Sequence, residues 1–355
     1  MRTSLGDRMT AWAVTGFLWG FRIMIVAVVI FGTIGTLRAG KYTPEQWMDF
    51  VVLGIAQGSI YALIALGYTM VYGILRMINF AHGEIFMSGA FGAYFVATRM
   101  SKTGFLNEYP LLAVVLIIAF AMLVSTSIAL LVERVAYRPL RGAPRLVPLI
   151  SAIGASFFLQ YSFRGFFGPG VYAYPPVKAL EGKWDIVGNG ILKTQLVAII
   201  AAVVMMAILY SIVMRTKVGK AMRAVSEDKD VAALMGIDVN RIIVSTFGLG
   251  AAMAGAAGVL FALIYHQVNF FMGFIPGIKA FTCAVLGGIG NIPGAMLGGL
   301  VLGVTESVGP ALFLEGIGIP RPYQLHDVIA FTMLITVLLF RPSGLLGERI
   351  TSKKA

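Results

Sequence analysis

The chain has 355 residues, of which 58% are hydrophobic and 12% are charged, roughly half the charged share of an ordinary soluble domain. This composition excludes a water-soluble globular protein, because a soluble surface needs charged side chains to stay dispersed. The formal net charge is +12, but no basic stripe interleaved with aromatic residues is present, so we expect no nucleic-acid partner. In a membrane protein, basic residues gather instead on cytoplasmic loops.

Long uncharged stretches separate the charges along the chain, and they cover residues 50–75, 109–132, 146–163, 194–214, 242–278 and 280–305. Each stretch could cross about 30 Å of hydrocarbon as a helix, whereas a β-barrel would show alternating segments of about 10 residues. The sequence therefore predicts an all-α integral membrane protein. We expect a polytopic helical bundle of about 8–10 spans, with broken or re-entrant segments near 73–84 and 286–294.

Residues 1–45 form an N-terminal extension with an extra span near 12–37. Arg2 and Arg8 precede an apolar stretch, and this pattern is also typical of a signal peptide, which is the alternative to a membrane span. Arg22 interrupts that stretch, and no cleavage site of small residues follows it. A membrane span is therefore the preferred interpretation, and it requires Arg22 and Arg38 to extend toward the membrane surfaces.

The first polar interruption of the hydrophobic chain follows the second predicted span. Asn79, His82, Gly83 and Glu84 lie between two apolar segments, and we name all four as candidate residues of a transport pathway. An ionisable group that borders an apolar helix is costly in a membrane. Glu84 therefore either caps the positive end of the helix that it begins or faces the pathway directly.

Basic residues cluster in two connections and in the C-terminal tail, which predicts that all three are cytoplasmic. The clusters are Arg134, Arg138, Arg141 and Arg145; Arg215, Lys217, Lys220, Arg223, Lys229 and Arg241; and Arg341, Arg349, Lys353 and Lys354. Counting spans between these clusters also predicts a cytoplasmic N-terminus.

The long basic connection, residues 215–241, contains a predicted short amphipathic helix. Val231, Leu234 and Met235 follow the spacing of one helix face, and Gly236 is a helix stop. A helix with an exposed apolar stripe in a cytoplasmic loop needs a protein partner. The alternative is a helix that lies on the lipid surface.

The same span count requires residues 279–307 to return to the outer side, as a re-entrant hairpin or as two short helices. The break has the sequence LGGIGNIPG at 286–294, with four glycines, one proline and one asparagine. Such an interruption is tolerated at membrane depth inside protein or beside a cavity, and it indicates a transport pathway. Thr282 and Asn291 therefore join the candidate pathway residues.

Catalytic and metal-binding patterns are missing from the sequence. His82, His266 and His326 lie far apart, no G-x-S-x-G motif occurs, and the P-loop-like run that starts at Gly35 has Tyr42 where Ser or Thr is required. We therefore expect no enzyme activity, no bound cofactor and no metal in this chain. The single Cys283 is expected to be a packing residue.

Four strings of this sequence resemble the LivH-type permease family of branched-chain amino acid ATP-binding-cassette (ABC) importers. They are SIYALIALGYTMVYG at 59–73, MINFAHGE at 77–84, ERVAYRP at 133–139, and KAFT followed after one residue by AVLGGIG at 279–290. The resemblance covers residues 46–347 and leaves 1–45 and a cytoplasmic tail at 348–355 outside. Glu227, Ala232, Ala233, Leu234 and Gly236 also resemble the loop by which such permeases engage their ATPases, although residues 228–231 separate the glutamate from the alanines.

The resemblance implies a permease subunit of the bacterial cytoplasmic (inner) membrane. Its partners would be a second related permease, two cytoplasmic ATPase subunits that use ATP and Mg²⁺, and an external solute-binding protein. Leucine, isoleucine and valine, or other neutral amino acids, are the implied cargo, whereas related permeases carry urea or short amides. An ion-coupled secondary transporter, a passive channel and a membrane-embedded enzyme are the rivals from other classes.

Overall fold

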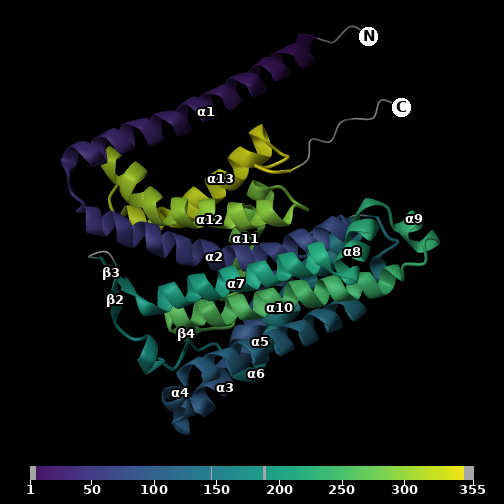
Figure 1. Ribbon diagram of the computed structural model, residues 1–355. Helices are drawn as coiled ribbons and strands as arrows, with labels where there is room; N and C mark the ends of the chain where they lie inside the picture. The colour runs from purple at the N-terminus through teal and green to yellow at the C-terminus, as the bar shows by residue number, and fades with distance from the viewer. Residues whose placement is uncertain (1–4, 145, 187–188, 348–355) are drawn as a thin grey trace.

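The computed structural model describes residues 5–144, 146–186 and 189–347, and it is a bundle of helices (Figure 1). The predicted tail at 348–355 lies outside the described residues. The α-helices are α1 (Leu5–Ala39), α2 (Pro44–Leu75), α3 (His82–Lys102), α4 (Phe105–Glu108), α5 (Pro110–Val132), α6 (Leu146–Phe167), α7 (Lys193–Arg215), α8 (Lys217–Glu227), α9 (Lys229–Leu234), α10 (Val239–Tyr265), α11 (Phe274–Gly287), α12 (Ile292–Gly309) and α13 (His326–Phe340).

Short elements complete the described chain. The π-helices are η1 (Glu133–Tyr137) and η4 (Pro310–Leu314), and the 3-10 helices are η2 (Arg138–Leu140), η3 (Lys178–Leu180), η5 (Glu315–Ile317) and η6 (Pro322–Leu325). The strands are β1 (Tyr172–Ala173), β2 (Lys183–Ile186), β3 (Asn189–Leu192) and β4 (Gln267–Val268). They form two antiparallel pairs, β1 with β4 and β2 with β3.

The predicted all-α membrane fold is confirmed. Eight helices of the described chain are long and apolar enough to cross a membrane: Trp12–Ala39, Pro44–Leu75, Pro110–Leu140, Leu146–Phe167, Lys193–Arg215, Val239–Tyr265, Ile292–Ile317 and Pro322–Phe340. The first of them contains the extra span expected at 12–37. Of the remaining apolar segments, α11 has only 14 residues and is too short to cross alone.

Helix α2 is the centre of the bundle, since it contacts α7, α10, α11 and α12. Small residues bring its backbone close to that of α12. A Cβ atom added to Gly303 would lie 2.3 Å from the Cα atom of Gly58, so neither position has room for a larger side chain. Close packing through small residues is the usual way in which membrane helices associate.

The bundle has two ends, which we name after their connections. Helices α8 and α9 lie at one end, on the right of Figure 1, where α1 also begins; β2, β3 and α4 lie at the other. The basic connections that were predicted to share a side meet at the α8–α9 end, because Arg141 bonds to Asn240 at 2.5 Å. Arg76, at the end of α2, donates to the carbonyl oxygen of Ser226 at 3.1 Å.

The starts of α3 and α11 are buried in the bundle. Helices α2 and α10 each end at a residue in the left-handed conformation, Arg76 and His266, and an irregular segment then leads into α3 or α11. The two starts pack together so closely that a Cβ atom on Gly83 would lie 2.5 Å from the carbonyl oxygen of Gly273. The break predicted near 73–84 is therefore present as the α2–α3 junction.

The second predicted break separates α11 from α12, which form a hairpin. The C-terminal segment closes it, since the backbone N–H groups of Leu345 and Leu346 donate to the carbonyl oxygens of Leu286 and Gly287 at 2.8 and 3.0 Å. The second arm differs from the expected short or re-entrant arm that ends at 307, because the helical path continues through η4 to Ile317 and is long enough to cross a membrane. Pro310 lacks a backbone N–H group, and the π-helix at this point accommodates it.

Candidate functional site

A cavity of about 570 Å³ lies between the N-terminal part of α2, the C-terminal end of α10 and the start of α13. Helices α2, α10, α11, α12 and α13 and the connection between α10 and α11 form its wall. Most of the wall is apolar or aromatic, and its lining includes Phe50, Leu53, Gln57, Tyr61, Phe261, Tyr265, Phe271, Met272, Ile275, Pro276 and Tyr323. Its size lies in the range of small-molecule binding sites.

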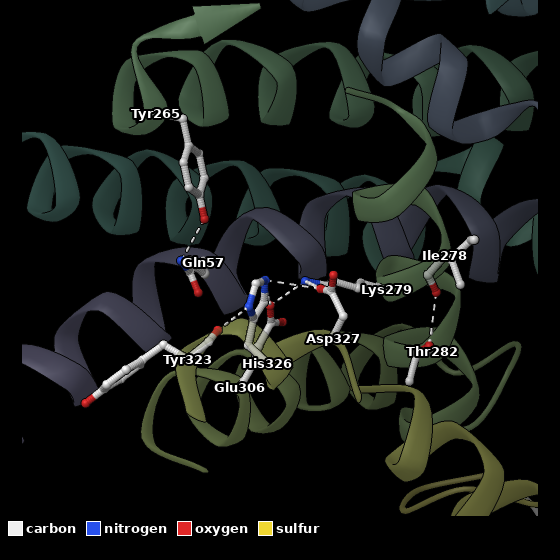
Figure 2. Close-up of polar contacts among 9 residues, drawn as sticks. All are labelled: Gln57, Tyr265, Ile278, Lys279, Thr282, Glu306, Tyr323, His326 and Asp327. Carbon is white, nitrogen blue, oxygen red and sulfur yellow. Dashed lines mark hydrogen bonds and ion pairs between the residues drawn. The ribbon is translucent and has the colours of Figure 1, made fainter. Parts of the chain in front are cut away.

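Four ionisable side chains meet in one corner of this cavity (Figure 2): Lys279, Glu306, His326 and Asp327. The Lys279 ammonium forms ion pairs with Glu306 and, at 2.5 Å, with Asp327. The side chains of Lys279 and Glu306 are each only 3% exposed. Nε2 of His326 lies 3.2 Å from a carboxylate oxygen of Asp327. We call these four residues the charged cluster.

The helix breaks bring the charged cluster together. Lys279 and Glu306 belong to the two arms of the α11–α12 hairpin, while His326 and Asp327 begin α13. The ring of His326 is held at Nδ1, which lies 2.8 Å from the carbonyl oxygen of Tyr323. Ionisable groups inside a membrane are expensive, and they normally pair with one another and mark a substrate or ion path.

Three members of the charged cluster have the geometry of a cation site. Ligand atoms of Glu306, His326 and Asp327 lie within 4.8 Å of one another, which is close enough to hold a metal ion. The Lys279 ammonium already contacts both carboxylates, so a metal ion would have to displace or neutralise it. A cation that can share the carboxylates with a lysine fits this arrangement better than a divalent metal.

The α2–α3 junction brings four of the predicted pathway residues together, and all four are buried. The hydroxyl of Tyr137 donates to Oδ1 of Asn79 at 2.5 Å, and the ring of His82 lies 4.9 Å from that of Tyr68. Gly83 packs against α11, as described above. Glu84 lies in the first turn of α3, and among the described residues its Oε2 atom has no hydrogen-bond partner.

The other two predicted pathway residues have local hydrogen bonds. Thr282 lies on α11, one turn beyond Lys279, and its hydroxyl donates to the carbonyl oxygen of Ile278 at 3.0 Å (Figure 2). Asn291 is the N-cap of α12, where its side chain accepts from the N–H group of Gly294 at 2.9 Å. Its amide group also donates to the carbonyl oxygen of Leu346 at 2.8 Å, so Asn291 joins the hairpin to the C-terminal segment.

The short amphipathic helix expected in the long basic connection is present as α9. Asp228 caps it by accepting from the N–H groups of Asp230 and Val231, and Gly236 ends it in the left-handed conformation. Of the residues named as the ATPase contact, Ala232 is buried, whereas Glu227, Ala233, Leu234 and Gly236 are exposed.

The apolar side chains of α9 are uncovered in this chain. Val231, Leu234 and Met235 are 54%, 87% and 77% exposed. Lys229, the first residue of α9, is partly buried, and this burial and the charges of Arg141 and Arg76 lower its pKa below the usual value. The helix therefore presents an exposed apolar stripe, which suits a partner that supplies an apolar surface.

Sequence reasoning missed the charged cluster. Lys279 and Glu306 are the charged residues on either side of the uncharged stretch 280–305, and from the sequence they were interpreted only as the limits of that stretch. The available signal was that a segment of 29 residues folded back on itself brings its two ends together. A lysine and a glutamate at those ends are then expected to pair.

The sequence is similar to one known protein family and to several transport proteins of bacteria and archaea. The family described as "Branched-chain amino acid transport system / permease component" matches residues 50–338. The permease protein BraD of Pseudomonas aeruginosa, from a high-affinity branched-chain amino acid transport system, is 45% identical over 308 residues, which cover 85% of this chain and 96% of that protein. The permease protein LivH of Escherichia coli K12, from a system of the same description, is 42% identical over 313 residues, or 86% of this chain and 97% of that protein.

A second kind of permease protein shows a partial likeness. The probable branched-chain amino acid transport permease protein LivM of Methanocaldococcus jannaschii is 27% identical over 144 residues, which cover 38% of this chain and 41% of that protein. The family match includes the cavity, the charged cluster and α9, and it leaves α1 outside.

Proposed function

Because this chain belongs to the branched-chain amino acid transport system permease component family, we propose that it is the membrane-spanning permease subunit of an ABC importer for branched-chain amino acids. The observation that carries this proposal is the 45% identity to BraD over 96% of that protein's length. The bundle of apolar helices supports it, since such a subunit has to provide the path through the membrane.

Energy would enter through α9. The exposed apolar stripe of this helix needs a covering partner, and we assign that role to two cytoplasmic ATPase subunits that bind ATP and Mg²⁺. The contact would consist of Glu227, Ala232, Ala233, Leu234 and Gly236. This chain would then bind no cofactor itself and would not act as an enzyme.

The complete importer would also contain a second permease of related type and an external solute-binding protein. The partial likeness to LivM supports the pairing of two related permeases. We place the chain in the bacterial inner membrane with residues 46–347 as the permease domain. The α8–α9 end and both termini would face the cytoplasm, because the basic connections meet at that end.

The transport pathway would be lined by residues of the two helix breaks: Asn79, His82, Gly83, Glu84, Thr282 and Asn291. Four of them lie in the buried α2–α3 junction, which packs against the start of α11. Movement at this contact would change the access of cargo from one end of the bundle to the other.

Uptake in cells tests the proposed function. A bacterial strain without its own branched-chain amino acid permeases would receive this chain together with its second permease, ATPase and binding-protein partners. We expect uptake of radiolabelled leucine and no uptake of urea. Urea uptake without leucine uptake would assign the chain to a different cargo, and leucine uptake that persists after removal of the ATPase subunits would contradict the proposal.

A further inference from the structure

The charged cluster contains two carboxylates and one ammonium group. We propose that Glu306 and Asp327, held by Lys279, bind the ammonium group of an amino acid that enters the cavity, while the aromatic wall receives its side chain. This inference rests on the proposed function, because it assumes that amino acids pass through this chain. It adds the residues and the chemical group by which they are recognised.

The charge count supports recognition of a cation. Lys279 contributes one positive charge, whereas ionised Glu306 and Asp327 contribute two negative charges, so with a neutral His326 the charged cluster carries one excess negative charge. Lys279 contacts Oε1 of Glu306, but Oε2 of Glu306 is buried and has no hydrogen-bond partner among the described residues. A buried carboxylate oxygen without a partner is unfavourable, and an arriving N–H donor would satisfy it.

Glu306 belongs to the wall of the cavity, and its unpartnered oxygen is covered by neighbouring atoms. Glu306 lines the cavity, as do Lys279 and Asp327, and its side chain is 3% exposed. An ammonium group that reaches this corner meets the buried Glu306 and Asp327, which is 37% exposed, and a carboxylate interacts with a cation more strongly the less water surrounds the two charges. A neutral solute of the same size gains nothing from the excess charge.

The rest of the cavity suits an apolar side chain. Tyr61, Phe261 and Tyr265 lie on the wall, and the hydroxyl of Tyr265 is already occupied by a hydrogen bond from Gln57 at 2.6 Å (Figure 2). Leu53 and Ile275 add aliphatic surface. The cavity therefore offers a charged corner for the ammonium group of an amino acid and apolar walls for its side chain.

Binding to the assembled importer in nanodiscs tests the proposal. The probes are leucine, 3-methylbutylamine, which keeps the amine but lacks the carboxylate, and 4-methylpentanoate, which lacks the amine. Saturation-transfer NMR of their methyl groups reports binding to the membrane complex without the solute-binding protein. We expect leucine and 3-methylbutylamine to bind and to compete with each other, and 4-methylpentanoate not to bind.

Two variants connect this binding to the charged cluster. Glu306→Gln keeps the shape of the side chain and removes the charge, so we expect leucine affinity to fall at least about tenfold, the loss of one charge-assisted hydrogen bond. The matched control is Glu181→Gln, which changes an exposed glutamate. The double variant Lys279→Met/Glu306→Leu replaces the ion pair with apolar groups and keeps the chain testable if Glu306→Gln does not fold.

Three results would overturn the proposal: equal binding of 4-methylpentanoate and leucine, unchanged leucine binding in both variants, or displacement of leucine by Zn²⁺ but not by 3-methylbutylamine. The last result would mean that the cluster is a metal site. Failure of the proposed function looks different, because the wild-type importer would then take up no leucine with all its partners present.

Discussion

Lys279 and Glu306 form an ion pair between the two arms of the α11–α12 hairpin, with 3% of each side chain exposed. Charges so well buried are stable only when they are paired. The pair therefore fixes the hairpin arms relative to each other, and through Asp327 it also ties them to the start of α13.

Loss of Lys279 alone should destabilise the chain. Lys279→Met leaves two carboxylates in the cavity corner without their cation, and we expect a loss of about 3–5 kcal/mol in the free energy of unfolding. The double variant Lys279→Met/Glu306→Leu should be closer to wild type, because an apolar pair can replace a buried ion pair. Denaturant unfolding in mixed micelles measures both. A double variant as unstable as the single one would contradict this account.

Gly83 should tolerate no side chain. In Gly83→Ala the added Cβ atom would lie 2.5 Å from the carbonyl oxygen of Gly273, and backbone atoms on both sides would have to move. We expect a loss of about 1–3 kcal/mol, as for other overpacked sites. The control is Gly248→Ala, where the nearest atom is 3.6 Å away, in Thr126. Thermal denaturation in detergent compares the two, and equal stabilities would show that the contact between α3 and α11 is looser than described.

Asn291 allows its cap role to be separated from a pathway role. Asn291→Ala removes the acceptor for Gly294 and the donor to Leu346, and we expect a loss of about 1 kcal/mol or more. Asn291→Asp keeps the acceptor and should restore part of that stability. If Asn291 also belongs to the pathway, Asn291→Asp should lower the rate of leucine uptake even though most of the stability is retained. Uptake that follows stability in both variants would remove Asn291 from the pathway.

Leu234 should matter for assembly and not for folding. Its side chain is 87% exposed on α9, so Leu234→Asp should leave the stability of this chain within about 0.5 kcal/mol of wild type. We expect the variant to lose most of its co-purification with the ATPase subunits, because a charge would enter an apolar contact. The exposed Lys220→Ala on α8 is the control. Normal co-purification of Leu234→Asp would show that α9 is not the contact.

The course of the helices was largely predictable from the sequence. The charges are so few that each uncharged stretch indicates a helix in the membrane, and the basic connections orient the stretches. The break between α11 and α12 was predictable for a different reason. The glycines and the proline between residues 286 and 294 interrupt a helix, because it cannot continue through them without loss of backbone hydrogen bonds.

The site was less predictable, because it depends on contacts between distant residues. Asn291 attracted attention for its position at a break, yet its hydrogen bonds cap α12 and hold Leu346. The charged cluster was missed because His326 and Asp327 come from a third helix. These two residues come close to Lys279 because α13 packs against α11, and no local sequence pattern predicts that packing.

The central claim is that this chain supplies the membrane path while separate ATPase subunits drive transport, and reconstitution tests it most directly. The chain would be placed in proteoliposomes with its second permease, either with or without the ATPase subunits. Leucine-loaded binding protein would be added on the outer side of the importer, and ATP on the opposite side, where the ATPase subunits bind. We predict accumulation of leucine against its gradient only when the ATPase subunits and ATP are both present. Accumulation without them, driven by an ion gradient, would contradict the account.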